Sequence, residues 1–192
     1  MDKFMKIIEE KLVPPMSKLG TQRHLLAIRN GVVSTLSLIL IGSFFLIFVN
    51  IPYKPLADLL APYSATIALP FRMTMGLMAI YATFIMGSDL AKSYKLDPTT
   101  GGVLSLGAFF MLQMPVNVTT PADAPLGFVL PMASLGASGM FSGILAMIFS
   151  VEIYRFFTKK KITIKMPEQV PPAVARSFEA LIPCLLYTSD AA

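Results

Sequence analysis

The stretch LPMASLGASGMFSGILAMIFSVEIYRFF, residues 130–157, overlaps an uncharged run of 28 residues, 124–151. A helix of 28 residues is about 42 Å long at 1.5 Å per residue, which exceeds the ~30 Å of bilayer hydrocarbon. The basic segment TKKKITIK (158–165) follows at once, as expected where a helix leaves the membrane on its cytoplasmic side. A membrane-spanning helix is therefore predicted here. The alternative is a buried helix of a soluble protein, which rarely needs such a length without charge.

The composition of the whole chain agrees with a membrane protein. Hydrophobic residues make up 55% and charged residues 14%, and the mean hydropathy is +0.67, whereas soluble domains carry about 25% charged residues. The net charge of +5 is spread in short patches between apolar runs, so we predict no nucleic-acid partner. The one cysteine, Cys184, excludes an internal disulfide and a thiolate metal cluster, and no cofactor is predicted.

Four transmembrane helices are predicted in an all-α, multi-pass bundle. The first covers 31–49, and the second covers 71–88 with a strictly uncharged run of only 16 residues, 73–88, so that a re-entrant or buried segment is its alternative. The third is expected at 100–116 after the helix-starting turn DPTT, and the fourth is the stretch quoted above. Between the spans, 56–63 indicates a short external helix and 117–128 an exposed loop.

An amphipathic helix is predicted before the first span. Phe4, Ile7, Ile8 and Leu12 recur at helical spacing in residues 1–13, and Pro14 and Pro15 follow them. Such a helix can lie at the membrane surface, and an ordinary helix packed against protein is an equal alternative.

The basic residues predict the orientation of the spans. If the N-terminus is cytoplasmic, four spans leave 14 of the 16 basic residues inside and only Lys54 and Arg72 outside. The inside set is Lys3, Lys6, Lys11, Lys18, Arg23, Arg29, Lys92, Lys95, Arg155, Lys159, Lys160, Lys161, Lys165 and Arg176. The same bias supports the weak second span, because without that span the basic residues would no longer lie mostly on one side of the membrane.

A small-residue motif in the fourth span predicts a close helix contact. Gly139 and Gly143 form G-x-x-x-G, which lets helix backbones approach in lipid, although the motif is also common by chance. The sequence does not say whether the contact lies within one subunit or between two.

Side chains able to perform catalysis are scarce. The single histidine, His24, stands beside Arg23 before the first span and is predicted to be a surface residue. Glu152 can pair with Arg155 or reach the interface, and Asp89 lies at a helix end, so structural roles are expected for both carboxylates. We predict no catalytic, metal-binding or cofactor-binding residue, and the absence of paired catalytic groups argues against a membrane enzyme.

Four segments carry a resemblance to a known family: MDKFMKIIEEKLVPPMSKLGTQRHLLAIRNG (1–31), LAKSYKLDP (90–98), LGASGMF (135–141) and KMPEQVPPAVARSFEALIP (165–183). Together they resemble the N-terminal part of the membrane component (enzyme IIC) of a bacterial phosphotransferase-system sugar permease, of the lactose, cellobiose and diacetylchitobiose type. The last segment is the most specific, because its proline spacing serves no general helical purpose.

The resemblance implies a division of the chain and a set of partners. Residues 1–30 would be an amphipathic N-terminal segment, and 31–183 the scaffold and dimerisation bundle, with a fifth helix starting at 177–183. The implied protein lies in the bacterial inner membrane as a homodimer, binds a β-disaccharide and presents it to the phosphocysteine of a soluble IIB partner, which performs the phosphotransfer. The sugar-site half would lie outside this chain, so no substrate-binding residue is expected and His24 is not given that role.

The last nine residues, CLLYTSDAA (184–192), are polar where the fifth helix of such permeases should continue apolar. They look like a translated sequencing adapter and are expected to be non-native. The alternative function is a small four-helix membrane subunit for interaction or assembly.

Overall fold

The computed structural model describes residues 20–118 and 127–160. Within these ranges the chain is a bundle of helices, as predicted, and it differs from the all-α prediction by one short β-hairpin. The predicted amphipathic helix at 1–13, the proline-rich segment 166–183 and the tail 184–192 lie outside the described residues.

The first helical rod consists of α3 (Arg23–Ser34) and α4 (Leu36–Val49), which are separated only by Thr35. Thr35 Oγ1 donates to Val32 O at 2.7 Å, and a Thr hydroxyl bonded to its own helix in this way commonly accompanies a bend. The whole rod, Arg23–Val49, has 27 residues and is long and apolar enough to cross a membrane. It corresponds to the predicted first span, and it starts at Arg23 instead of Gly31.

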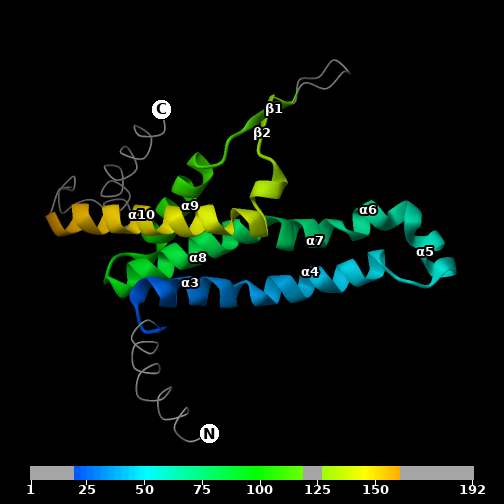
Figure 1. Ribbon diagram of the computed structural model, residues 1–192, viewed down its shortest axis with the longest axis horizontal. Helices are drawn as coiled ribbons and strands as arrows, with labels where there is room; N and C mark the ends of the chain where they lie inside the picture. The colour runs from blue at the N-terminus through cyan, green and yellow to red at the C-terminus, as the bar shows by residue number, and fades with distance from the viewer. Residues whose placement is uncertain (1–19, 119–126, 161–192) are drawn as a thin grey trace, which may run out of the picture.

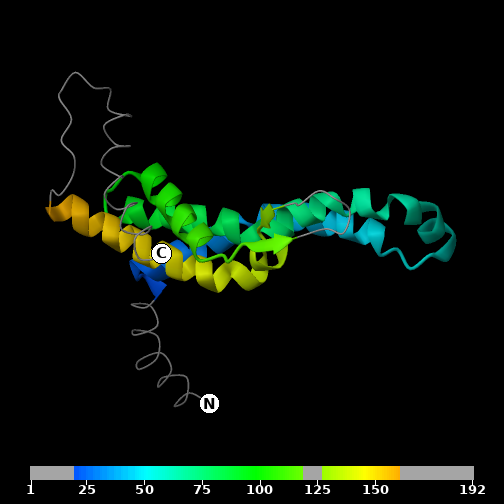
Figure 2. The same cartoon turned by 90° about the horizontal axis from the view of Figure 1, so that it is seen from above.

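The chain returns through a series of short helices that merge into a long one. These are α5 (Lys54–Leu60), η2 (Ala61–Tyr63), α6 (Ser64–Ile67), α7 (Leu69–Thr74), η3 (Met75–Leu77) and α8 (Met78–Ser93). Ala61–Ser93, with 33 residues, is a second segment long and apolar enough to cross a membrane, and it is longer than the predicted second span. Figures 1 and 2 show α4 and α5–α7 as an arm that extends beyond α9 and α10.

Helix α9 (Pro98–Met111) begins as the sequence predicts and ends early. Asp97 caps it by accepting bonds from the backbone N–H and the hydroxyl of Thr100, at 2.8 and 2.7 Å. Its 14 residues make about 21 Å, less than the bilayer hydrocarbon. The predicted third helix at 100–116 is therefore wrong at its C-terminal end, where Pro115 cannot continue a helix and Val116 lies in a strand.

A two-stranded hairpin occupies the ends of the predicted loop 117–128. Strand β1 (Val116–Val118) pairs antiparallel with β2 (Gly127–Val129), with Val116 opposite Val129. Gly127 has φ of +70°, a conformation that glycine adopts without a steric penalty, and it starts the returning strand.

The fourth predicted span begins later than expected. Residues 130–139 form η4 (Met132–Ser134) and η5 (Ala137–Gly139), and α10 covers Met140–Lys160. Pro131, with ψ of 122°, and Gly136, with ψ of −149°, both have non-helical backbones, so the apolar run is not one helix from Leu130. The segment Ala137–Lys160, with 24 residues, is the third that is long and apolar enough to cross a membrane.

Helix α8 is the centre of the bundle and packs against α3, α9 and α10. Its Ala82, Met86 and Leu90 are fully buried and form one core with Met147 and Val151 of α10. A second core joins α8 to α9 and α10 through Ala79, Phe109, Leu135 and Ala146. Between α9 and α10, the buried hydroxyls of Ser105 and Ser150 lie 2.9 Å apart.

Candidate functional site

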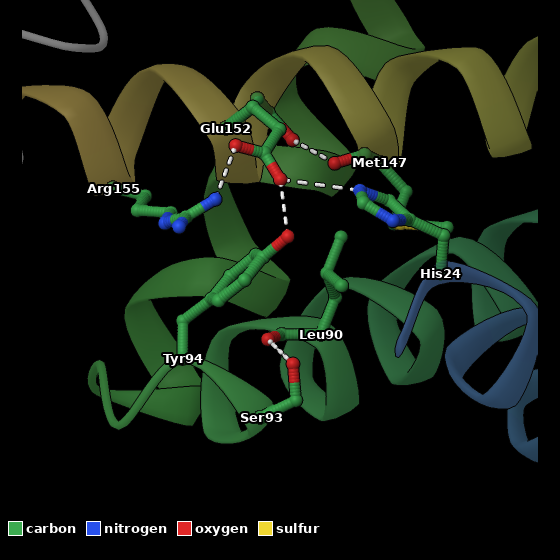
Figure 3. Close-up of polar contacts among 8 residues, drawn as sticks. His24, Leu90, Ser93, Tyr94, Met147, Glu152 and Arg155 are labelled. Carbon is green, nitrogen blue, oxygen red and sulfur yellow. Dashed lines mark hydrogen bonds and ion pairs between the residues drawn. The ribbon is translucent and has the colours of Figure 1, made fainter. Parts of the chain in front are cut away.

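Four side chains meet where α3 begins and where α8 and α10 approach their C-terminal ends (Figure 3). Glu152 of α10 lies at the centre: its Oε1 is 3.1 Å from His24 Nε2, and its Oε2 accepts from Arg155 Nη1 at 3.1 Å. The hydroxyl of Tyr94 donates to the same Oε1. We call His24, Tyr94, Glu152 and Arg155 the Glu152 junction.

Tyr94 is positioned by the way α8 ends. Lys95 adopts the left-handed conformation with φ of 60°, and its N–H bonds to Lys92 O at 3.0 Å, while Leu96 N–H reaches back to Ala91 O at 3.0 Å. This pair of bonds is the Schellman arrangement that closes a helix, and it turns Tyr94 towards α10.

The Tyr94 ring also makes cation–π contacts with two arginines. The guanidinium carbon of Arg155 lies 4.1 Å from the ring centroid and that of Arg23 lies 5.3 Å away. His24 meets the ring edge-on at 6.3 Å. Cation–π contacts of this kind contribute about 0.5–1 kcal/mol at exposed sites. The ring therefore connects α3 to α10 through π contacts, in addition to the hydrogen bond.

The Glu152 junction is half-buried, with His24 29% and Glu152 35% exposed. Burial raises the pKa of Tyr94 above its usual value of 10.0, and the hydrogen bond to Glu152 and that group's negative charge raise it further, against the lowering by Arg155 and Arg23. Tyr94 is therefore protonated at neutral pH and can donate to Glu152. The arrangement suits a clamp between helix ends, since one carboxylate binds side chains from all three of them.

The structure brings some predicted residues together and changes the interpretation of others. Glu152 pairs with Arg155, one of the two outcomes the sequence left open. His24, predicted to be a surface residue, keeps 29% of its side chain exposed and is also a partner of Glu152. Asp89 accepts from Asn30 Nδ2 at 2.8 Å, which ties α8 to α3. Tyr94 was not singled out by the sequence, because 58 residues separate it from Glu152.

Gly143 and Gly139 face the inside of the same chain. A Cβ at Gly143 would overlap Thr83 Oγ1 of α8 and lie 3.7 Å from Phe109 Cδ2 of α9. A Cβ at Gly139 would overlap the Ser134 carbonyl oxygen, because Gly139 ends the η5 turn before α10. A Cβ at Gly139 would also lie 3.3 Å from Ala79 Cβ, so both glycines approach α8.

A second polar place lies near the hairpin. Gln113, which is 7% exposed, donates to Ser142 Oγ at 3.3 Å, and the hydroxyl of Ser142 donates to Gly139 O at 2.8 Å. Ser134 and Ser138 complete a cavity of about 280 Å³. For the part of the chain that the structure describes, no group of three or more His, Cys, Asp or Glu is placed to hold a metal ion.

Comparison with known proteins identifies relatives over nearly the whole chain. The family described as "Phosphotransferase system, EIIC" matches residues 29–189. The cellobiose-specific EIIC component of Geobacillus stearothermophilus and the lichenan permease IIC component of Bacillus subtilis (strain 168) are each 37% identical over 193 residues, with 95% of this chain covered. Among solved structures, the crystal structure of the transporter ChbC, the IIC component from the N,N'-diacetylchitobiose-specific phosphotransferase system, superposes with a TM-score of 0.85 at 36% identity.

The matches cover much less of the relatives than of this chain. The chain spans 43% of the cellobiose-specific component, 42% of the lichenan permease component and 45% of the ChbC chain, whereas 96% of this chain is covered by the ChbC match. Three described segments are long and apolar enough to cross a membrane, as a membrane transporter component requires. This chain belongs to the EIIC family of the phosphotransferase system.

Proposed function

We propose that this chain forms the N-terminal scaffold and dimerisation bundle of a permease that imports a β-linked disaccharide. The observation that carries the proposal is the unequal coverage: 95% of this chain matches 43% of the cellobiose-specific relative. The sugar site, and the presentation of the sugar hydroxyl to the phosphocysteine of a IIB partner, would then belong to the remaining part of such a permease. The scaffold would orient the part that holds the sugar site and would bind no sugar itself.

The proposed topology has four spans, with the N-terminus in the cytoplasm and an amphipathic helix at the membrane surface before the first span. Its support is the position of the basic residues. The start of α3, the end of α8 and the end of α10 lie at one end of the bundle (Figure 1), and these helix ends with the residues beside them contain Arg23, Lys92, Lys95, Arg155, Lys159 and Lys160. Lys54 stands in α5 at the far end of the arm (Figure 1). Such a cluster is expected on the cytoplasmic side. Helix α9 would be the third span, completed by the turn at Leu112 and the residues that lead to β1.

The Glu152 junction has a defined part in this proposal. It joins the cytoplasmic ends of three helices, α3, α8 and α10, where a soluble partner would approach. The Glu152 carboxylate contacts side chains from α3, from α10 itself and from the end of α8. These contacts would keep the three helix ends in a fixed relative position while the sugar-binding part of the permease moves against them.

A chimera tests the proposed function. Residues 1–183 of this chain would replace the matching segment of the cellobiose-specific relative, in cells that lack their own cellobiose permease. We expect phosphoenolpyruvate-dependent cellobiose uptake, with the intact relative as the positive control and the relative lacking the segment as the negative control. A chimera that inserts into the membrane at control levels and gives no uptake would contradict the proposal, and would favour a separate assembly subunit.

A further inference from the structure

A cavity of about 310 Å³ lies between α3 and α8, beside the Glu152 junction. Its α3 wall carries Arg23, Ala27 and Asn30, spaced four and three residues apart on one helix face, together with Leu26. Its α8 wall carries Asp89 and Lys92. The cavity therefore combines two cations, one carboxylate and an apolar patch.

The position of this cavity relative to the bilayer follows from the two helices that form it. The first segment able to cross a membrane starts at Arg23, and the second ends at Ser93. Helices α3 and α8 pack together, and Figure 1 shows the start of α3 and the end of α8 at the same end of the bundle, so the two segments are antiparallel. Arg23 and Ser93 both line the cavity, which therefore lies at this end of both segments. Lipid headgroups occupy this level of a bilayer, and basic pockets between transmembrane helices bind headgroups.

The charges of the cavity are available to a ligand. Within residues 20–118 and 127–160, both ion pairs involve Glu152, so neither Arg23 nor Lys92 has a carboxylate partner there. Arg23 Cζ lies 5.3 Å from the centroid of the Tyr94 ring, and the guanidinium carries five N–H donors for further bonds. Asp89 accepts one bond, from Asn30 to Oδ2 at 2.8 Å, and a carboxylate has room for further donors.

We propose that this cavity binds the headgroup of a phosphatidylethanolamine lipid. Arg23 and Lys92 donate to the phosphate, Asp89 accepts from the ammonium group, and Leu26 contacts the start of the acyl chains. The commitment to this lipid rests on charge complementarity. Phosphatidylglycerol offers no cation to Asp89, and the trimethylammonium of phosphatidylcholine has no N–H to donate.

Native mass spectrometry of the full 192-residue chain, released from mild detergent with each lipid in turn, tests the assignment. We expect phosphatidylethanolamine to be retained roughly tenfold better than phosphatidylcholine or phosphatidylglycerol, the factor that one charge-assisted hydrogen bond supplies. Asp89→Asn keeps the size of the side chain and should abolish that preference. Lys92→Gln should lower retention of all three lipids, whereas Lys54→Gln, in the distant α5, should change nothing.

Two results would overturn the proposal. One is equal retention of the three lipids by the unaltered chain. The other is an undiminished preference in an Asp89→Asn variant whose melting temperature matches that of the unaltered chain. If Asp89→Asn does not fold, Lys92→Gln decides, and unchanged retention in that variant refutes the site. Competition by soluble glycerophosphoethanolamine at the lipid's own concentrations would refute a lipid source, because the acyl contacts would then contribute nothing.

Discussion

The hydroxyl of Tyr94, one residue past the end of α8, donates to Oε1 of Glu152 on α10, and His24 Nε2 of α3 lies 3.1 Å from the same oxygen. One carboxylate oxygen thus connects three helices that are far apart in the sequence. Removing either neighbour should loosen the helix ends. Loss of the whole Tyr94 ring would also affect the apolar core that contains Leu90 and Ala91, because the ring packs against it.

Tyr94→Phe should lower stability at neutral pH and change its alkaline pH dependence. The folded-state pKa of Tyr94 is raised above 10.0, so its contribution is present below pH 10.0 and is lost as pH rises through the higher folded value. We expect the melting temperature of the unaltered chain in detergent to fall above about pH 10, and that fall to be smaller in Tyr94→Phe. Tyr81→Phe, an exposed tyrosine elsewhere on α8, is the matched control. Identical alkaline profiles for Tyr94→Phe and the unaltered chain would contradict this role.

Glu152→Leu should destabilise the chain more than Glu152→Gln. Leucine removes the acceptor used by Tyr94, His24 and Arg155, whereas the glutamine carbonyl can still accept from some of them. Each hydrogen bond lost at a half-exposed site contributes about 0.5–1 kcal/mol, so Glu152→Leu should lower the melting temperature by several degrees. Circular dichroism at rising temperature measures both variants. Equal melting temperatures for Glu152→Leu and Glu152→Gln would mean that the Glu152 carboxylate is solvated and does not stabilise the contact between the helix ends.

The sequence predicted the parts of the fold that follow from local pattern. The apolar lengths gave the first span and the existence of a helix through 140–157, and the Asp97-Pro98 start of α9 was visible as a capping pattern. Glu152 and Arg155 could be paired because they are three residues apart on one helix. His24 could not be placed, because its partner lies 128 residues away.

Other features were not predicted, because a continuous apolar sequence does not show where the backbone leaves the helical conformation. The run around Pro131 and Gly136 has the composition of a membrane helix, but the backbone of both residues is non-helical, so α10 starts after them. The hairpin was predicted as a loop, because three-residue strands are too short to show the alternation of a β-strand.

The orientation can be tested by labelling cysteines from outside intact cells, in a Cys184→Ser background. Cysteine at Lys54 should react with an impermeant maleimide, and cysteines at Lys95 and Lys160 should react only after the cells are permeabilised. The reason is the basic cluster at the Lys95 and Lys160 end of the bundle. Labelling of Lys160→Cys but not Lys54→Cys in intact cells would reverse the proposed orientation.

The purified chain should not bind cellobiose or diacetylchitobiose in a saturable manner. A disaccharide site needs several convergent polar groups in one cleft. In the described part of the bundle, the Gln113 and Ser142 cavity measures about 280 Å³, and the Ser142 hydroxyl already bonds to backbone. Isothermal titration calorimetry should give no binding heat, with the intact cellobiose-specific relative as the positive control. A micromolar dissociation constant would place a sugar site within this chain.

The contact between Gly143 and Thr83 makes the helix-packing prediction specific. A Cβ at Gly143 would overlap Thr83 Oγ1, and Thr83 is fully buried with no hydrogen-bond partner for that hydroxyl in the described structure. Gly143→Ala should therefore lower the melting temperature, and Gly143→Ile should lower it further, because a branched side chain must also displace Phe109. Membrane insertion should be unchanged in both variants, since alanine and isoleucine are both apolar and are tolerated in a transmembrane helix.

A compensating change separates this contact from a general loss of helix quality. Thr83→Ala removes the hydroxyl that the new Cβ would strike, so the double variant Gly143→Ala with Thr83→Ala should melt close to Thr83→Ala alone. Gly107→Ala on α9, where a Cβ meets nothing within 4 Å, is the matched control and should melt at or above the unaltered chain. If Gly143→Ala melts like Gly107→Ala, α10 does not pack closely on α8 at this point. If the single variant is destabilised and Thr83→Ala fails to restore it, the obstruction comes from the backbone or from Phe109 instead of the Thr83 hydroxyl.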